Sequence, residues 1–213
     1  MIGETGTVAA RRSLLAAVEG ARGHFRYESG HHGDLWLDLD TLFLDAREVR
    51  RWGAALAQEA AGRDAQVICG PLSGGAFVAQ EMAAELGASF VFVERFVSPS
   101  APVAYRIPAS LRPRLRGRSV IVVDDVVNAG SAILATVAEI RACEAELVGF
   151  ASLLVLGEAL TRTTQQYGVP FFRLATLQRG LWSPEACPLC RAGEPLEDRL
   201  VTQPASRLLS DVV

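Results

Sequence analysis

A chain of 213 residues, half of them hydrophobic, is long enough for one large domain with a full hydrophobic core. Its net charge of −3 gives no overall positive field that would attract nucleic acid, and no apolar run approaches the roughly 18 residues that a membrane span needs. All 21 basic residues are arginines, so the chain has no lysine amine for chemistry.

The start of the sequence has no basic-then-apolar signal pattern, and its four cysteines are too few and too scattered for a disulfide framework. We therefore expect a single cytoplasmic domain over residues 1–213, with reduced thiols and with neither nucleic acid nor a membrane among its partners.

The first 62 residues predict a small N-terminal hood followed by a helix. We expect a helix over 7–22, an extended FRYESG at 25–30, a strand through DLWLDLD at 34–40 and a helix that begins near Asp45. In DLWLDLD the leucines alternate with Asp and Trp, so the two kinds of side chain face opposite ways.

From residue 63 onward, short apolar strands alternate with helices. Runs rich in Val, Ile and Phe lie at 65–71, 90–95, 118–126 and 146–156, as is typical of strands that are buried on both faces of a parallel sheet. Apolar spacing predicts helices over 74–87 and 130–143, between those strands. The pattern predicts an α/β fold with a doubly wound, mostly parallel sheet and with ligands at the carboxyl ends of its strands. The core would span 63–160, and 161–213 would form a C-terminal strand and tail.

A Ser-Gly-Gly turn at 73–75 joins the first core strand to the first core helix. Missing side chains let backbone N–H groups approach an anion closely, although such a turn is often only a tight connection. No G-x-G-x-x-G follows a strand, and no G-x-x-x-x-G-K-[ST] loop is present, so dinucleotides and nucleoside triphosphates are poor candidates.

The segment 95–118 combines six arginines and four prolines with no acidic residue. The prolines argue against a continuous helix or a central strand, so we expect a long excursion from the core. A solvated basic loop is the plain interpretation. A lid that brings cations to an anionic ligand is the alternative, and its position between two core strands favours it.

The strand at 120–123 runs directly into Asp124 and Asp125 and then into a turn of small residues. Backbone amides and the N-terminus of the next helix favour a phosphate there, and Asn128 and Ser131 can add donors. Two carboxylates beside a phosphate would repel it unless a polyol or a divalent metal lies between them. A ribose 5-phosphate supplies that polyol, and it explains the coincidence of strand, acids and loop better than a capping pair of acids without a ligand.

Together these stretches resemble the phosphoribosyl-pyrophosphate (PRPP) signature of the type I phosphoribosyltransferases. The order of FRYESG, DAREVRRWGAALAQ, GPLSGGAFVA, FVFVER and VIVVDDVVNAGSA is similar to orotate phosphoribosyltransferases over nearly the whole chain. The resemblance implies a homodimer that uses Mg²⁺ to transfer phosphoribose from PRPP to a nitrogenous base. Orotate is the favoured base, with orotidine 5′-monophosphate of pyrimidine biosynthesis as the product.

The resemblance also implies roles for individual residues. Asp124 and Asp125 would act in catalysis, orient the ribose hydroxyls and hold Mg²⁺ through water. The lid arginines that would neutralise pyrophosphate are Arg95, Arg106 and Arg112, with Arg114 as a further candidate. The residues implied in PRPP binding are Leu72, Ser73, Gly74, Gly75, Asp124, Asp125, Val126, Val127, Asn128, Ala129, Gly130, Ser131 and Ala132. The residues implied in base binding are Phe25, Ser29 and Gly30.

Two departures from the family's pattern keep alternatives open. Glu28 stands where the family usually has a lysine, and the lid contains arginines where the family usually has lysines and a His-Gly pair. Arginine binds pyrophosphate well but cannot shed a proton, so no lid residue could act as a lysine-type general acid. A PRPP- or nucleotide-binding regulator and a purine-salvage transferase are the alternatives.

Two further groups of residues suggest metal ligands only weakly. We expect a surface loop or a substrate rim, and not a metal site, at His31, His32 and Asp34. Neighbouring side chains on an extended chain point in different directions and so do not converge on one ion. Cys187 and Cys190 form half of a zinc-binding pattern. With no second pair nearby in the sequence, a metal there would need ligands from a partner chain, so we expect reduced, unliganded thiols.

Overall fold

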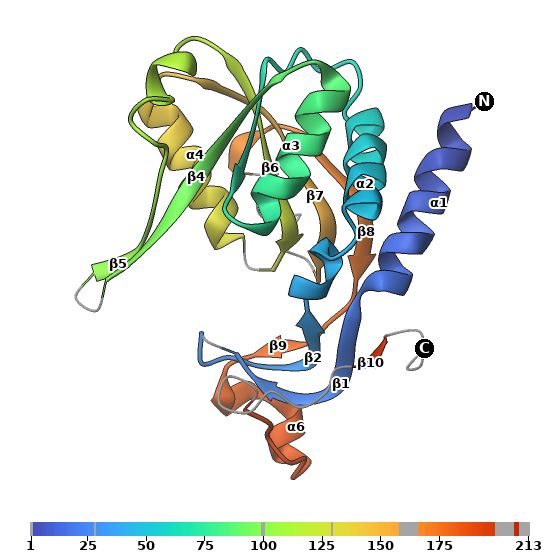
Figure 1. Cartoon of the computed structure of the whole chain (residues 1–213). Helices are drawn as coiled ribbons and strands as arrows, with labels where there is room; N and C mark the ends of the chain where they lie inside the picture. The colour runs from blue at the N-terminus through green and yellow to red at the C-terminus, as the bar shows by residue number, and fades with distance from the viewer. Residues whose placement is uncertain are drawn as a thin grey trace.

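The computed structural model describes residues 2–27, 29–98, 101–128, 130–157, 166–198 and 207–208. A six-stranded sheet flanked by helices forms the body, and a smaller four-stranded sheet lies at one end of it (Figure 1). The smaller sheet is the predicted hood.

The main sheet has the strand order β5-β4-β3-β6-β7-β8. Its strands are β3 (Val67–Pro71), β4 (Ser89–Ser98), β5 (Ala101–Arg106), β6 (Ser119–Val127), β7 (Glu146–Leu156) and β8 (Phe171–Leu177). All neighbouring strands are parallel except β4 and β5, which form an antiparallel hairpin at the edge. The doubly wound, mostly parallel sheet is therefore confirmed.

Helices cover both faces of this sheet. The helices α1 (Ile2–Ala17), α2 (Ala46–Glu59) and α3 (Gly74–Leu86) lie on one face, and α4 (Ser131–Ala142) lies on the other (Figure 1). Successive residues of β6 alternate between the two cores: Ile121 and Val123 pack beneath α3, whereas Val120 and Val122 pack beneath α4. Burial on both faces explains why this strand is apolar from Val120 to Val123, up to its acids.

Local signals set the start of α2 and the end of α3 where the sequence predicts them. Asp45 caps α2 by accepting a hydrogen bond from the Arg47 N–H at 2.9 Å. Gly87 ends α3 in the left-handed conformation, with φ +66°.

The hood has the strand order β10-β1-β2-β9, all antiparallel. Its strands are β1 (Glu19–Arg26), β2 (His32–Asp38), β9 (Leu181–Trp182) and β10 (Arg207–Leu208). The prediction of a helix over 7–22 was wrong at its end, because α1 stops at Ala17 and Gly20–Arg22 pair with Leu35–Leu37 of β2. Strand pairing outweighs the weak helical preference of a stretch that contains Gly20 and Gly23.

After β8 the chain returns to the hood. It forms β9, the short 3₁₀ helix η3 (Pro184–Ala186) and α6 (Pro188–Arg191), and then pairs with β1 through a bridge between Phe25 and Glu197. Of two further 3₁₀ helices, η1 (Asp40–Phe43) connects β2 of the hood to α2, and η2 (Arg112–Arg114) lies between β5 and β6. The described part of the C-terminal region thus spans the main sheet and the hood.

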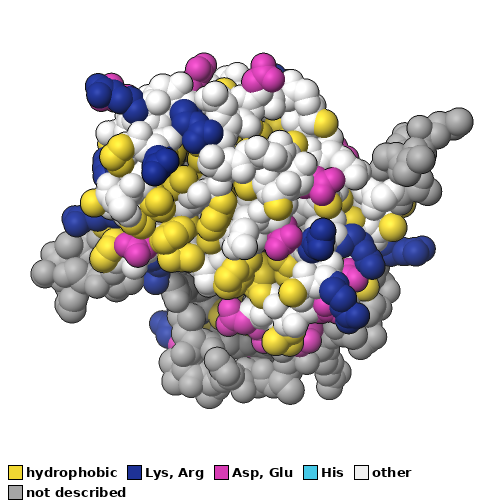
Figure 2. Space-filling view, turned by 45° about the horizontal axis from the view of Figure 1, so that its top comes forward, with side chains coloured by type: hydrophobic (Ala, Val, Ile, Leu, Met, Phe, Trp, Pro, Cys, Tyr) yellow, Lys and Arg dark blue, Asp and Glu magenta, His cyan; other side chains and the backbone are white. Residues whose placement is uncertain are grey.

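The surface carries both charge signs. On the face shown in Figure 2, arginine and acidic side chains are interspersed and hydrophobic side chains gather between them. The side chains coloured there form no continuous basic surface of the kind that binds nucleic acid. No helix among the described residues is long and apolar enough to cross a membrane.

Candidate active site

Asp124 and Asp125 lie near the carboxyl end of β6, where the strand leaves the core. Asp124 pairs with Ser152 of β7 and is only 7% exposed. Its Oδ1 accepts a hydrogen bond from the Asp125 N–H at 3.1 Å, and the Ser152 hydroxyl donates to the Asp125 carbonyl at 3.0 Å. The strand and its neighbour therefore fix the backbone of the acid pair.

Both carboxylates point at the first turn of α3. A Cβ on Gly75 would lie 2.9 Å from Asp124 Oδ1, and a Cβ on Gly74 would collide with the Asp125 carboxylate. Glycine is required at both positions because the acid pair approaches the α3 backbone so closely. The sequence pattern alone predicts only an anion-binding turn or a tight connection here. The peptide bond between Leu72 and Ser73, just before them, is cis.

Burial disfavours the ionised form of both carboxylates. Desolvation raises the pKa of Asp124 well above its ordinary range, and the neighbouring charge of Asp125 raises it further. Desolvation also raises the pKa of Asp125. Within the described part of the chain, no arginine forms an ion pair with either acid. A ligand that supplies hydroxyl donors or positive charge would favour the ionised pair.

The turn after the acids exposes the N-terminus of α4. Gly130 is the N-cap in the left-handed conformation, with φ +81°, and no side chain caps the helix. The N–H groups of the first helical turn have no partner within the helix, so those of Ser131 and Ala132 are available to an anion. Val127 is fully buried and serves the core. Ala129 lies outside the described residues.

A cavity of about 570 Å³ lies between the hood and this edge of the sheet. The residues that line it are Tyr27, Ser29, Leu35, Trp36, Leu37, Leu39, Val126, Asn128, Ser131, Leu156, Arg179 and Leu181. The cavity therefore brings the predicted Ser29 of the hood together with Val126, Asn128 and Ser131 of the phosphate turn. Tyr27 and Trp36, whose ring centroids lie 6.3 Å apart in a stacked arrangement, give the hood side an aromatic wall.

Arg179 is the pocket residue that the sequence analysis missed. It follows β8, and one guanidinium nitrogen, Nη2, donates to Asn128 Oδ1 while the group lies 5.6 Å from the centre of the Tyr27 ring. The other two nitrogens, Nε and Nη1, are buried without a hydrogen-bond partner among the described residues. Asp34 holds the neighbouring backbone by accepting from the Gly180 N–H at 2.7 Å. Arg179 therefore places a cation at the wall of the cavity, which suits an anionic ligand.

A second hollow, of about 480 Å³, lies beside the Ser-Gly-Gly turn. Its lining joins Leu72 and Ser73 to three residues of β4, among them Arg95. Arg106 is exposed on the same hairpin, with its guanidinium 5.6 Å from the Phe96 ring. Arginines of the hairpin thus lie on the side of the turn where a diphosphate would extend.

Several predicted site residues line neither hollow, among them Asp124 and Asp125, which point at the first turn of α3, and three residues that have other roles. Phe25 is 0% exposed, so its ring belongs to the hood core and presents no surface to a base. The guanidinium of Arg112 pairs with Glu139 of α4 at 2.6 Å, so it anchors the base of the hairpin to the body. Gly30 forms an exposed turn by donating its N–H to the Tyr27 carbonyl at 2.9 Å. The predicted roles of Phe25 in base binding and of Arg112 in catalysis are untested, and this geometry favours neither.

Known proteins have similar sequences or similar folds. The phosphoribosyl transferase domain family matches residues 41–170. The orotate phosphoribosyltransferase of Caldanaerobacter subterraneus subsp. tengcongensis is 29% identical, over 88% of this chain and 91% of its own. That of Heliobacterium modesticaldum is 30% identical, over 81% of this chain and 86% of its own.

Two solved structures illustrate the shared fold. Orotate phosphoribosyltransferase from Mycobacterium tuberculosis, in complex with inorganic phosphate, matches with a TM-score of 0.59 at 20% identity, over 81% of this chain and 96% of that one. Adenine phosphoribosyltransferase from Rhodothermus marinus matches with a TM-score of 0.61 at 19% identity, over 80% and 99%. The fold alone therefore does not distinguish a pyrimidine acceptor from a purine.

Proposed function

The chain belongs to the phosphoribosyltransferase family, and from this premise we propose that it transfers phosphoribose from PRPP to orotate in a Mg²⁺-dependent reaction. The products would be orotidine 5′-monophosphate and pyrophosphate. The family and the enzyme class follow from the sequence matches. The acceptor, the metal and the roles of individual residues are the proposal.

The observation that carries the choice of orotate is the positively charged guanidinium of Arg179 at the wall of the cavity. Orotate is a planar base with a carboxylate, and adenine has no such group. The guanidinium of Arg179 is a cation at the wall of the cavity and would attract that carboxylate, while the aromatic wall of Tyr27 and Trp36 receives the ring. A base without a carboxylate would leave this cation without an anionic partner on the ligand.

The sugar phosphate fits the opposite side of the same cavity. Its 5-phosphate would lie at the uncapped first turn of α4, where Ser131 and backbone N–H groups can donate to it. Its ribose hydroxyls would donate to Asp124 and Asp125, which have no cationic partner among the described arginines. The diphosphate would extend along the turn at Leu72–Gly75 toward Arg95.

The donor set of the acid pair suits Mg²⁺, because carboxylate oxygens are the hard ligands that this cation prefers. The raised pKa values of both acids also indicate a place where added positive charge would be stabilising. Asp124 and Asp125 would hold the ion through water. When bound, it would supply charge neutralisation to the departing diphosphate.

The chain's own residues would then act by positioning and by charge. As the C1–O bond of ribose stretches, positive charge develops on the sugar and negative charge on the leaving diphosphate. The acid pair precedes Val126, a cavity residue, and would stabilise a ribose bound there, while Arg95 would stabilise the diphosphate. Arg179 would hold the base so that its ring nitrogen faces C1.

The homodimer implied by the resemblance stays a prediction. Sedimentation equilibrium would show it as a mass near twice 22.8 kDa.

The variant Arg179→Gln tests the assignment of orotate. We expect the KM for orotate to rise about 10- to 100-fold, because a hydrogen-bonded charge pair is lost, while the KM for PRPP changes little. Arg173→Gln on β8 is the matched control, since its side chain is exposed and lies outside this cavity. Equal KM values for orotate in the Arg179 variant and the parent would contradict the proposed contact.

A further inference from the structure

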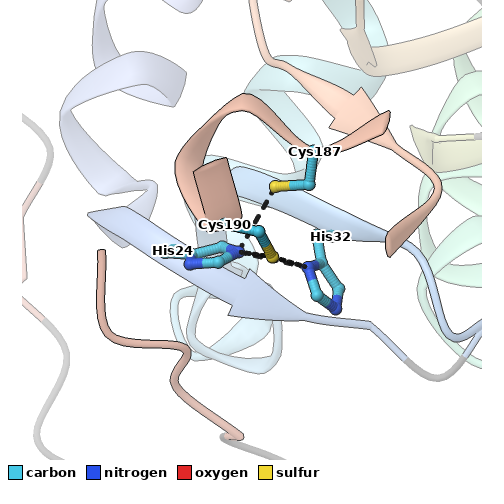
Figure 3. Close-up of side chains that lie close together, drawn as sticks. All are labelled: His24, His32, Cys187 and Cys190. Atoms are coloured by element: carbon cyan, nitrogen blue, oxygen red, sulfur yellow. Dashed lines mark hydrogen bonds between the residues drawn. The ribbon is translucent and has the colours of Figure 1, made fainter. Parts of the chain in front are cut away.

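Four potential metal ligands converge at the far end of the hood, outside the cavity described above. His24 of β1, His32 of β2, Cys187 before α6 and Cys190 within α6 direct their side chains at one another (Figure 3). One ligand atom from each residue lies within 4.8 Å of all the others. We propose that these four side chains bind a structural Zn²⁺ ion. This proposal does not depend on the proposed catalytic function.

Four of the six distances between these atoms match the edges of a zinc tetrahedron. His24 Nε2 lies 3.2 Å from His32 Nδ1, 3.4 Å from Cys187 Sγ and 3.6 Å from Cys190 Sγ, and His32 Nδ1 lies 3.2 Å from Cys190 Sγ. Zinc bonds of about 2.0 Å to nitrogen and about 2.3 Å to sulfur give tetrahedral edges of about 3.3 Å between nitrogens and about 3.6 Å between nitrogen and sulfur. The other two distances are within 4.8 Å, so the ion would draw Cys187 closer to His32 and Cys190.

Hydrogen bonds hold this cluster only weakly, because thiols are weak donors. His24 Nδ1 lies 2.9 Å from the Glu194 carbonyl, which only accepts, so Nδ1 carries the proton and the neutral ring has a single lone pair at Nε2. Both thiols and His32 Nδ1 lie within reach of that one lone pair. A cation would instead take one lone pair from each of the four side chains. A carbonyl behind the ring is also the usual outer support of a zinc-bound histidine.

The local fold presents the two sulfurs on the same side. Cys187 starts the turn of α6 and accepts a hydrogen bond from the Arg191 N–H at 3.3 Å, and Gly193 closes it with φ +73°. On the other side, His32 lies opposite Trp182 in the pairing of β2 with β9. The C-x-x-C segment is therefore held against the strands that carry the histidines.

These contacts correct two expectations from the sequence. His32 is 6% exposed and so lies neither in a surface loop nor on a substrate rim. A metal at Cys187 and Cys190 needs no ligands from a partner chain, because His24 and His32 of the same chain complete the set.

The ligand set indicates a structural role. All four positions come from the protein, so no position is left for water or substrate, and two thiolates with two neutral imidazoles cancel the charge of Zn²⁺. Three of the ligands are buried and only Cys190 is exposed. The ion would tie the segment that carries β9 and α6 to strands β1 and β2, next to the point where Arg179 enters the cavity.

Metal analysis of the full-length protein, purified without added metal, tests this inference. We expect about one zinc per chain by elemental analysis. Replacement by Co²⁺ should give tetrahedral d–d bands together with a thiolate charge-transfer band. Cys190→Ser should lose most of the bound metal, whereas Cys143→Ser, which removes a thiol of α4's C-terminus, should keep it.

The wild-type measurement stands even where a cysteine variant fails to fold. Chelation of the metal should lower the midpoint of thermal unfolding, and circular dichroism should report that the starting protein is folded. Folded wild-type protein that contains no zinc and gives no tetrahedral cobalt spectrum would overturn the proposal. So would a disulfide between Cys187 and Cys190 in the freshly purified protein.

Discussion

Asp124 is a carboxylate that the fold buries without a cationic partner among the described residues. Its pKa is raised chiefly by desolvation, so the folded apo protein holds a proton that the unfolded chain releases. That proton contributes stability that is complete below the ordinary aspartate pKa of about 4 and is lost as the pH rises through the raised value. The residue that would bind ribose thus lowers the stability of the free protein as the pH rises.

Asp124→Asn should separate the stability of the protein from its activity. We expect the free energy of unfolding of the apo variant to fall less with rising pH than that of the parent, because the amide carries no titrating proton. Turnover should fall about 10²- to 10³-fold, as for the loss of one oriented transition-state contact. Urea titrations between pH 5 and 8 measure the first effect, with Asp64→Asn in an exposed loop as the control. Identical pH slopes for parent and Asp124→Asn would refute the burial argument.

Among single residues, the sequence predicts those site residues that lie close together along the chain. One strand and the turn after it contain four of these residues, namely Asp124, Asp125, Asn128 and Ser131. Their closeness at the edge of the sheet therefore follows from local sequence. Arg179 could not be found in that way, because it reaches Asn128 only through the pairing of β7 with β8. No local pattern distinguishes it from the other arginines of the chain.

Among the elements, the hairpin of β4 and β5 differs most from its expectation as an irregular excursion. The prolines correctly argued against a central strand, and β5 lies at the edge of the sheet, where a missing backbone N–H is tolerated. The segment after β5 packs on the body, with Ile107 and Leu115 buried. Composition alone does not reveal which arginines face a ligand and which bind the body.

Two arginine variants distinguish these roles. Arg95→Ala should raise the KM for PRPP about tenfold, because a cation beside the diphosphate turn is lost. Arg112→Ala should leave that KM unchanged and reduce the free energy of unfolding by about 1 kcal/mol or less, as expected for a partly exposed pair with Glu139. Steady-state kinetics and urea titration measure the two effects. A larger KM effect at Arg112 than at Arg95 would reverse the assignment.

At the scale of the whole molecule, the main sheet was predictable and the closure of the hood was not. Apolar runs and helix caps determine β3, α3, β6 and α4 from neighbouring residues. The hood depends on contacts between distant segments, such as Asp34 with Gly180 and His24 with Cys187. These long-range contacts complete both the cavity and the proposed zinc site, so sequence periodicity contains no sign of them.

The most direct test of the account is pyrophosphate release by the purified protein with PRPP, Mg²⁺ and a panel of bases. We expect release with orotate and little or none with uracil, which is orotate without the carboxylate that Arg179 would bind, or with adenine, guanine and hypoxanthine. Release with a purine but not with orotate would contradict the assignment of the acceptor. Tight binding of PRPP without release for any base would contradict catalysis itself.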